Sequence, residues 1–191
     1  MKINALTRRQ ALHRAGTLGL AATTMLATEV FAAVFMEAEQ AQRLLLPQAE
    51  AFAPVVLELD DLKLAAIAKQ SDTHVPKNYA PKVWQAFAAG KSMGWVVIDK
   101  VIGKYDVIDY AVGFVQDGSV AGVEILAYRE SHGSEVRQSA WRKQFVGRKG
   151  PQNMRFADDI RNISGATLSC QHVTEGIQRV SSLVSLLGPG R

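Results

Sequence analysis

Residues 164–169 read Ser-Gly-Ala-Thr-Leu-Ser and combine residue types that can hold a phosphate group. Gly165 permits a tight turn and lets the backbone approach a ligand closely. Ser164 can cap a helix that starts here, and the first amides of such a helix favour an anion. Thr167 then adds a hydroxyl beside that anion. On these residues alone, the segment predicts either an ordinary helix cap or a phosphate site.

A second polar segment comes earlier in the chain and follows an apolar run. Glu130, His132 and the backbone amides around Gly133 can bond to the polar edge of a ligand. Trp141 and Phe145 can stack on a planar ligand. The alternatives are a strand-end carboxylate for Glu130, an exposed turn for His132 and ordinary core packing for the two aromatic residues.

Both segments resemble the FMN-binding domain family. Residues 164–169, preceded by Asp159, resemble its flavinylation motif, and residues 128–135 resemble its Glu-x-x-Gly segment. Quinone-reductase members of the family carry a Pro-Gly element after this Glu, whereas this chain has Ser-His-Gly, so we expect a stand-alone relative. In the family an aromatic-and-glycine segment follows, and this chain resembles it at Trp141, Gln144, Phe145 and Gly147.

The family includes the C subunit of the sodium-translocating NADH:quinone reductase and the G subunit of the Rnf complex. The resemblance implies FMN bound covalently as a phosphoester on Thr167, placed there by a flavin transferase that takes FMN from FAD. It also implies further cofactor-binding residues in the two segments: Ser164, Gly165, Ala166, Leu168, Ser169, Glu130, His132, Gly133, Trp141 and Phe145.

The remaining chemistry-bearing residues give weaker signals. Cys170, the only cysteine, follows Thr167 closely, where a helix start can lower a thiol pKa. No base lies near it in the sequence, so a packing role is the alternative. None of the four histidines has a cysteine or second histidine at ligand spacing, and we expect no metal site. No Gly-x-Gly-x-x-Gly fingerprint is present, which argues against direct use of NAD(P)H.

The formal net charge of +4 reflects the N-terminus. Without residues 1–32 the chain is close to neutral, which predicts no nucleic-acid partner. Residues 1–14 form a basic leader, and the apolar stretch 15–27 follows, as in an export signal. Residues 7–12 also resemble a twin-arginine signal, although Ala11 replaces the usual bulky apolar residue.

We therefore predict a location in the periplasm or on the outer face of the cytoplasmic membrane. Residues 15–36 are also long enough for a retained N-terminal membrane anchor. A third interpretation is a buried N-terminal helix of a cytoplasmic protein.

The elements that must position these residues follow from periodicity. We predict a helix at 37–49 that Pro47 is expected to end, and a second helix around 59–67. A loop at 71–81 and a short helix at 82–89 that stops at Gly90 follow. Residues 33–90 are thus expected to be a helical N-terminal segment.

An antiparallel meander is predicted next, with strands at 95–102, 105–115 and 120–128 and a turn at Asp117-Gly118. Helical structure is expected at 134–144 and a loop at 147–153. A long C-terminal amphipathic helix ends the chain, because one apolar stripe advances by four and three residues: Val173, Ile177, Val180, Val184 and Leu187.

The expected fold is α+β, with the meander packed against helices. Residues 1–32 are the export signal or anchor, and 91–191 are the FMN-binding domain. The resulting hypothesis is an extracytoplasmic electron-transfer flavoprotein with a membrane-bound or periplasmic redox partner. It describes an electron carrier, or part of an oxidoreductase system, rather than a free-standing enzyme. The alternatives are a non-redox sensor or assembly module of the same fold, and a reductase with its own small-molecule substrate.

Overall fold

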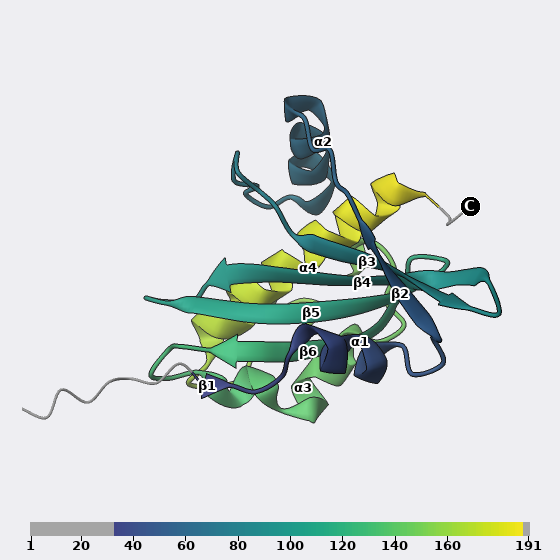
Figure 1. Ribbon diagram of the computed structural model, residues 1–191. Coiled ribbons are helices and arrows are strands. Elements are labelled where there is room, and N and C mark those ends of the chain that lie inside the picture. The colour runs from purple at the N-terminus through teal and green to yellow at the C-terminus, as the bar shows by residue number, and fades with distance from the viewer. Residues whose placement is uncertain (1–32, 189–191) are drawn as a thin grey trace, which may run out of the picture.

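The computed structural model describes residues 33–188, which fold around one antiparallel sheet (Figure 1). The predicted export signal, residues 1–32, lies outside the described residues. The strand order is β1-β6-β5-β4-β3-β2, and every neighbouring pair is antiparallel. The strands are β1 (Ala33–Val34), β2 (Ala51–Val55), β3 (Lys82–Ala88), β4 (Lys91–Ile102), β5 (Val107–Val115) and β6 (Val120–Tyr128).

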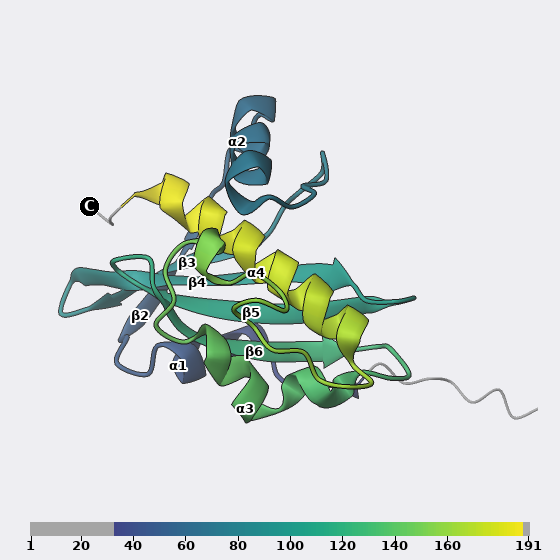
Figure 2. The same ribbon diagram turned by 180° about the vertical axis from the view of Figure 1, so that it is seen from behind.

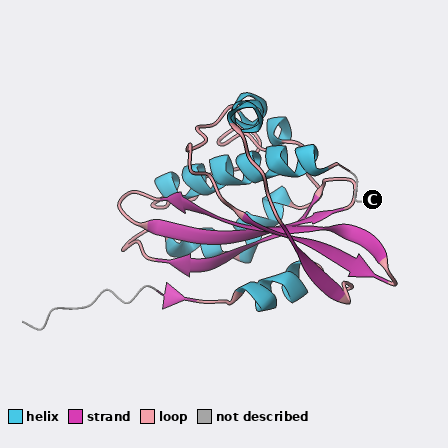
Figure 3. Ribbon diagram, turned by 45° about the horizontal axis from the view of Figure 1, so that its top comes forward, coloured by secondary structure: helices cyan, strands magenta, loops and turns pink. Residues whose placement is uncertain are grey.

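Helices cover both faces of this sheet. The long helix α4 lies across one face, with α2 stacked on it, and α1 packs on the opposite face (Figures 2 and 3). In the described residues no helix is long and apolar enough to cross a membrane. The helices are α1 (Ala38–Leu45), α2 (Asp61–Ser71), α3 (Ser139–Arg142) and α4 (Thr167–Leu187), with short 3-10 turns η1 (Ser134–Arg137), η2 (Lys143–Phe145) and η3 (Pro151–Asn153).

The main core forms where β5 meets α4. Residues of one parity on β5 are fully buried and pack with the apolar stripe of α4. Burying each such side chain contributes about 1.5–3 kcal/mol. The predicted α+β fold, its meander and its C-terminal amphipathic helix are therefore confirmed. The two sets are Ile108, Tyr110, Val112 and Phe114 on β5, and Val173, Ile177, Val180 and Val184 on α4.

A smaller core lies under α1. Ala41 and Leu45 pack with Val96 and Ala111 on the other face of the sheet. Helix α1 ends at Leu45, just before Pro47, as expected from the backbone restriction that a proline places on the residue before it.

The helix predicted at 82–89 is wrong. These residues form β3, which pairs with β4, and Ala88 lies opposite Lys91. Ala89 and Gly90 have φ values of 48° and 70°, so they form a two-residue hairpin turn. Gly90 indicated a helix end because a helix C-terminus and a hairpin turn both need a residue that tolerates positive φ.

Residues 33–90 are accordingly not helical throughout, although they contain α1 and α2. They supply β1, β2 and β3, and the sheet continues across the expected boundary at residue 90. Strand β2 contains Pro54, which cannot donate a ladder hydrogen bond and is tolerated because β2 is an edge strand.

The helix predicted at 134–144 is divided into η1, α3 and η2. Val136, Trp141 and Phe145 are buried as expected, while Ala140 is exposed. The turn between β4 and β5, residues 103–106, is closed by a 2.8 Å hydrogen bond from the Gly103 amide to the Asp106 carbonyl. We call these four residues the β4–β5 turn.

Candidate functional site

Thr167 is the first residue of α4, and no side chain caps this helix. Ala166 is the residue before the first turn. The amides of Thr167, Leu168 and Ser169 therefore have no acceptor within the helix and can bind an anion. The prediction that Ser164 caps α4 is wrong, because its exposed side chain lies in the preceding turn.

The chain reaches this helix start through a tight turn. Gly165 has a φ of +87°, and a Cβ built on it would have no neighbour within 4 Å, so the space in front of it is open. Ala166 is buried, and its amide bonds to the Ile163 carbonyl at 3.0 Å. The turn thus fixes the backbone while leaving its outer side accessible.

The hydroxyl of Thr167 is exposed and has a defined partner. Asn162 donates a hydrogen bond from Nδ2 to Thr167 Oγ1 at 2.8 Å. The amide occupies one lone pair of the hydroxyl oxygen and leaves its hydrogen available to another group. Sequence reasoning missed Asn162, because nothing in its position distinguishes it from an ordinary loop residue.

The two segments singled out in the sequence meet at Gly133. This glycine has a φ of +91°, and a Cβ on it would lie 2.6 Å from Ser169 Oγ and 2.7 Å from the Tyr128 hydroxyl. Tyr128 donates to the carbonyl of His132, so Ser169 must donate to the Tyr128 oxygen, 2.8 Å away. These contacts lock the end of β6 against the first turn of α4.

Glu130 holds the β4–β5 turn. Its Oε1 accepts hydrogen bonds from the amides of Tyr105 at 2.5 Å and Asp106 at 2.9 Å. A Cβ on Gly103 would lie 2.5 Å from the same oxygen, so the glycine makes room for the carboxylate. This geometry gives Glu130 a structural role, and direct contact with a ligand stays a prediction, as it does for the exposed His132.

His172 is a second anchor of this turn. Its Nδ1 lies 3.1 Å from the Gly103 carbonyl oxygen. The β4–β5 turn and the start of α4 lie at the same end of the sheet in both views (Figures 1 and 2). His172 follows Leu168 by four residues, which places both on one face of the helix. That spacing was visible in the sequence, but the contact with Gly103 was not.

Trp141 and Phe145 are core residues. Trp141 is 3% exposed and packs edge to face on the fully buried Phe145, with ring centroids 5.2 Å apart. The indole Nε1 donates to the Arg161 carbonyl at 2.8 Å. Phe145 has no surface with which to touch a ligand, so of the two alternatives the structure favours core packing.

The segment around Trp141 instead positions the loop that leads to Thr167. Gln144 Oε1 accepts from the Arg161 amide at 2.8 Å, and Arg148 donates to the Asp159 carbonyl at 3.0 Å. Asp159 itself bonds to the amide of Arg155, and this hydrogen bond holds the pKa of its carboxyl below the usual value. A groove of about 680 Å³ lies along this loop.

Cys170 is fully buried one turn into α4. Burial raises the pKa of its thiol, because a thiolate would lose its solvation there. The pKa-lowering effect of the helix start does not prevail, and the packing role is favoured.

A buried polar cluster joins α4 to the sheet farther along. Asp99 Oδ2 accepts hydrogen bonds from the Tyr110 hydroxyl at 2.8 Å, the Tyr79 hydroxyl at 3.3 Å and Arg179 Nη2 at 2.9 Å. Burial, and then the charge of Asp99, raises the pKa of both tyrosines well above the usual value, so they remain donors. Sequence reasoning missed this cluster, because its members are far apart in the chain.

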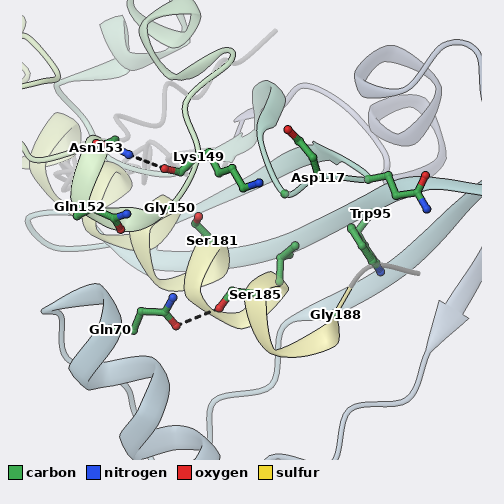
Figure 4. Close-up of a pocket in the computed structure, with 13 residues that line it drawn as sticks. Gln70, Trp95, Asp117, Lys149, Gly150, Gln152, Asn153, Ser181, Ser185 and Gly188 are labelled. Atoms are coloured by element: carbon green, nitrogen blue, oxygen red, sulfur yellow. Dashed lines mark hydrogen bonds between the residues drawn. The ribbon is translucent and has the colours of Figure 1, made fainter. Parts of the chain in front are cut away.

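A pocket of about 690 Å³ lies at the opposite end of α4 (Figure 4). Trp95, Lys149 and Ser185 are among its lining residues. Ser185 follows Thr167 by 18 residues, about 27 Å along a helix with a rise of 1.5 Å per residue. This pocket is therefore separate from the site around Thr167. Among the described residues, no group of three or more His, Cys, Asp or Glu side chains is arranged to hold a metal ion.

Comparison with known proteins gives the context of this site. Residues 103–182 match the model of a family described as the FMN-binding domain, which confirms the resemblance drawn from the sequence and supports FMN as the cofactor. A crystal structure of NqrC from Shewanella oneidensis is similar, with a TM-score of 0.47 and 17% sequence identity over 78% of this chain and 83% of that chain. A search of curated proteins found no match.

Proposed function

We propose that this chain, whose residues 103–182 match the FMN-binding domain family, carries FMN covalently on Thr167 and relays electrons outside the cytoplasm. The electrons would pass between a membrane-bound or periplasmic partner and a downstream acceptor. One observation carries the proposal: an exposed threonine hydroxyl occupies the first position of an uncapped helix.

The residues present fit a phosphate ester. The amides of Thr167, Leu168 and Ser169 supply donors, and the positive end of the helix dipole favours the negative charge. Asn162 Nδ2, now on Thr167 Oγ1, adds a further donor at the ester oxygen. The open space at Gly165 admits the bulk of the phosphate.

The chemistry divides between cofactor and protein. Bound FMN supplies one- or two-electron redox chemistry, and the protein supplies orientation and electrostatics. For attachment, a transferase would form the bond between the Thr167 oxygen and the FMN phosphorus as the pyrophosphate bond of FAD breaks, so that AMP leaves and the hydroxyl proton goes to a base. Among the described residues Thr167 Oγ1 has one hydrogen-bond partner, Asn162, which is not a base. The transferase would therefore provide the base.

Export is the second part of the proposal. The basic leader and apolar stretch of residues 1–32 support it. Covalent attachment also suits an exported carrier, because flavin lost outside the cytoplasm is not readily replaced. Replacing Arg8 and Arg9 together by lysine should leave the chain in the cytoplasm if a twin-arginine route is used, as cell fractionation would show.

Intact-mass analysis of the full chain, co-expressed with a flavin transferase, tests the attachment. The wild type should gain the mass of FMN less water, and Thr167→Ala should not. Ser139→Ala is the matched control, because this exposed hydroxyl lies on α3, outside residues 164–169, and should be dispensable for attachment. An unmodified wild type, or a modification that persists in Thr167→Ala, contradicts the proposal.

A loaded protein also tests the redox role. If membranes containing a suitable donor reduce the bound flavin, the relay is supported. A flavin that stays oxidised with every membrane donor, but changes partner binding, would favour the non-redox module instead.

A further inference from the structure

The β4–β5 turn is built into the site by both neighbouring elements. His172 of α4 contacts its Gly103 carbonyl, and Glu130 after β6 binds its Tyr105 and Asp106 amides. Glu130 also belongs to the segment that Gly133 ties to Ser169. The turn is thus held at a defined place beside the first two turns of α4.

This well-anchored backbone carries an exposed aromatic side chain. Tyr105 is 79% exposed, and among the described residues it is the only aromatic residue in the exposed class. Leu168, directly after Thr167, is 41% exposed. Leu168 lies one helical turn before His172 on the same face, which is the face that meets Gly103. The turn that carries Tyr105 therefore meets the face of α4 on which Leu168 lies.

A charged group accompanies the ring. Lys104 Nζ lies 4.8 Å from the centroid of Tyr105, within cation–π distance. The carboxylate of Glu130 is engaged by two backbone amides, and that of Asp106 by the amide of Val107. The turn thus offers an aromatic ring with a cation over one of its faces.

We propose that the isoalloxazine ring of the tethered FMN packs against Tyr105 and Leu168, with Lys104 beside its polar edge. This inference rests on the proposed attachment to Thr167. Trp141 and Phe145 are buried, so the β4–β5 turn takes the role that the sequence suggested for them. Stacking on Tyr105 covers apolar surface that is otherwise exposed. A cation near the ring favours the anionic reduced flavin and so raises its reduction potential.

Fluorescence of the loaded full chain tests the stacking, because a stacked phenol or indole quenches flavin emission. After intact-mass analysis confirms the same FMN load in each protein, Tyr105→Leu should fluoresce several-fold more strongly than the wild type. Tyr105→Trp should remain quenched. Both variants alter an exposed side chain and leave the backbone bonds to Glu130 in place.

The midpoint potential tests the place of Lys104. Lys104→Gln should lower the potential of the bound flavin, because a positive charge near the ring is lost. Lys149→Gln is the matched control: it removes an exposed lysine from the pocket at the far end of α4 and should leave the potential unchanged.

The outcomes separate this inference from the attachment itself. A wild-type chain without FMN on Thr167 overturns both. A loaded chain in which Tyr105→Leu changes neither emission nor potential overturns the ring position alone. If that variant slows only electron transfer to a partner, Tyr105 is a partner contact and the inference is likewise overturned.

Discussion

The Thr167 hydroxyl is held by the Asn162 amide, 2.8 Å away. A hydroxyl that already points in a fixed direction reacts faster than one that rotates freely, because less orientation must be gained on the way to the transition state. Asn162 therefore acts on attachment through Thr167, as a positioning residue.

Asn162→Ala should slow attachment of FMN by about 2- to 10-fold, the equivalent of one hydrogen bond of about 0.5–1.5 kcal/mol. The initial rate with purified transferase and FAD, followed by intact mass, measures it. Asn153→Ala is the control, because the side chain of this exposed asparagine donates to the Lys149 carbonyl and lies away from Thr167. If the two variants are modified at the same rate, whether or not that rate is below the wild-type rate, the positioning role is contradicted.

At Cys170, burial raises the thiol pKa more than the start of the helix lowers it. Its folded thiol pKa is raised, so the folded protein keeps the proton at a pH where the unfolded chain begins to lose it. The free energy of unfolding should therefore fall as pH rises above about 8.5, the usual thiol pKa. Iodoacetamide should alkylate Cys170 far more slowly in the folded protein than in urea, and equal rates would contradict this account.

Between elements, the contact of β6 with α4 depends on Gly133. Gly133→Ala meets two penalties: a positive φ, about 1–2 kcal/mol, and overlap with Ser169 and Tyr128, about 1–3 kcal/mol. Gly118→Ala meets only the first, because its φ of +85° lies in open space. Urea unfolding should show the Gly133 variant to be the less stable of the two. If the two variants lose equal stability, the hydroxyl oxygens of Ser169 and Tyr128 must move aside without cost, which would contradict the second penalty.

The β3–β4 hairpin offers a gain in stability. Ala89 has a φ of 48°, in a region that Asn tolerates better than Ala. Ala89→Asn should raise the free energy of unfolding by about 0.5–1 kcal/mol, since Asn-Gly is the favoured pair for this turn. Ala140→Asn, at an exposed helical position, should give no gain in the same urea titration. A loss in the Ala89 variant would contradict the turn assignment.

Elements with a strong periodicity were predictable from the sequence. The alternation on β5 and the stripe on α4 each bury one face, and both appear where expected. Strand β3 was not predictable, because Ala and Gln in residues 82–89 also suit a helix and only pairing with β2 and β4 decides the outcome.

The site divides in the same way. Thr167 lies in a local motif and was identified from it. Asn162, His172 and the β4–β5 turn were not, because their roles come from contacts; His172 and Gly103, for instance, lie 69 residues apart. A pattern of neighbouring residue types does not show which distant residues will come into contact.

For the whole molecule, the buried cluster of Asp99 and Arg179 joins α4 to β4. Removing one charge leaves the other buried and unpaired, so Asp99→Leu and Arg179→Met should each lower the free energy of unfolding by about 3–5 kcal/mol. The double replacement Asp99→Leu with Arg179→Met should lose less than the sum of the two single losses, because no lone charge remains. Urea unfolding of the three variants measures this coupling, and additive losses would contradict it.

The same cluster constrains how a relay of this design would operate. Arg179 lies 12 residues after Thr167, about 18 Å along the helix, and its bond to Asp99 fixes α4 against the sheet. The helix therefore cannot move the attached flavin from one place to another. On the proposed function, the flavin could swing only on its own short ribityl arm. The electron donor and the electron acceptor would then have to bind, one after the other, to the same surface around the flavin. An excess of either would obstruct the other, and turnover would be fastest when the two are balanced.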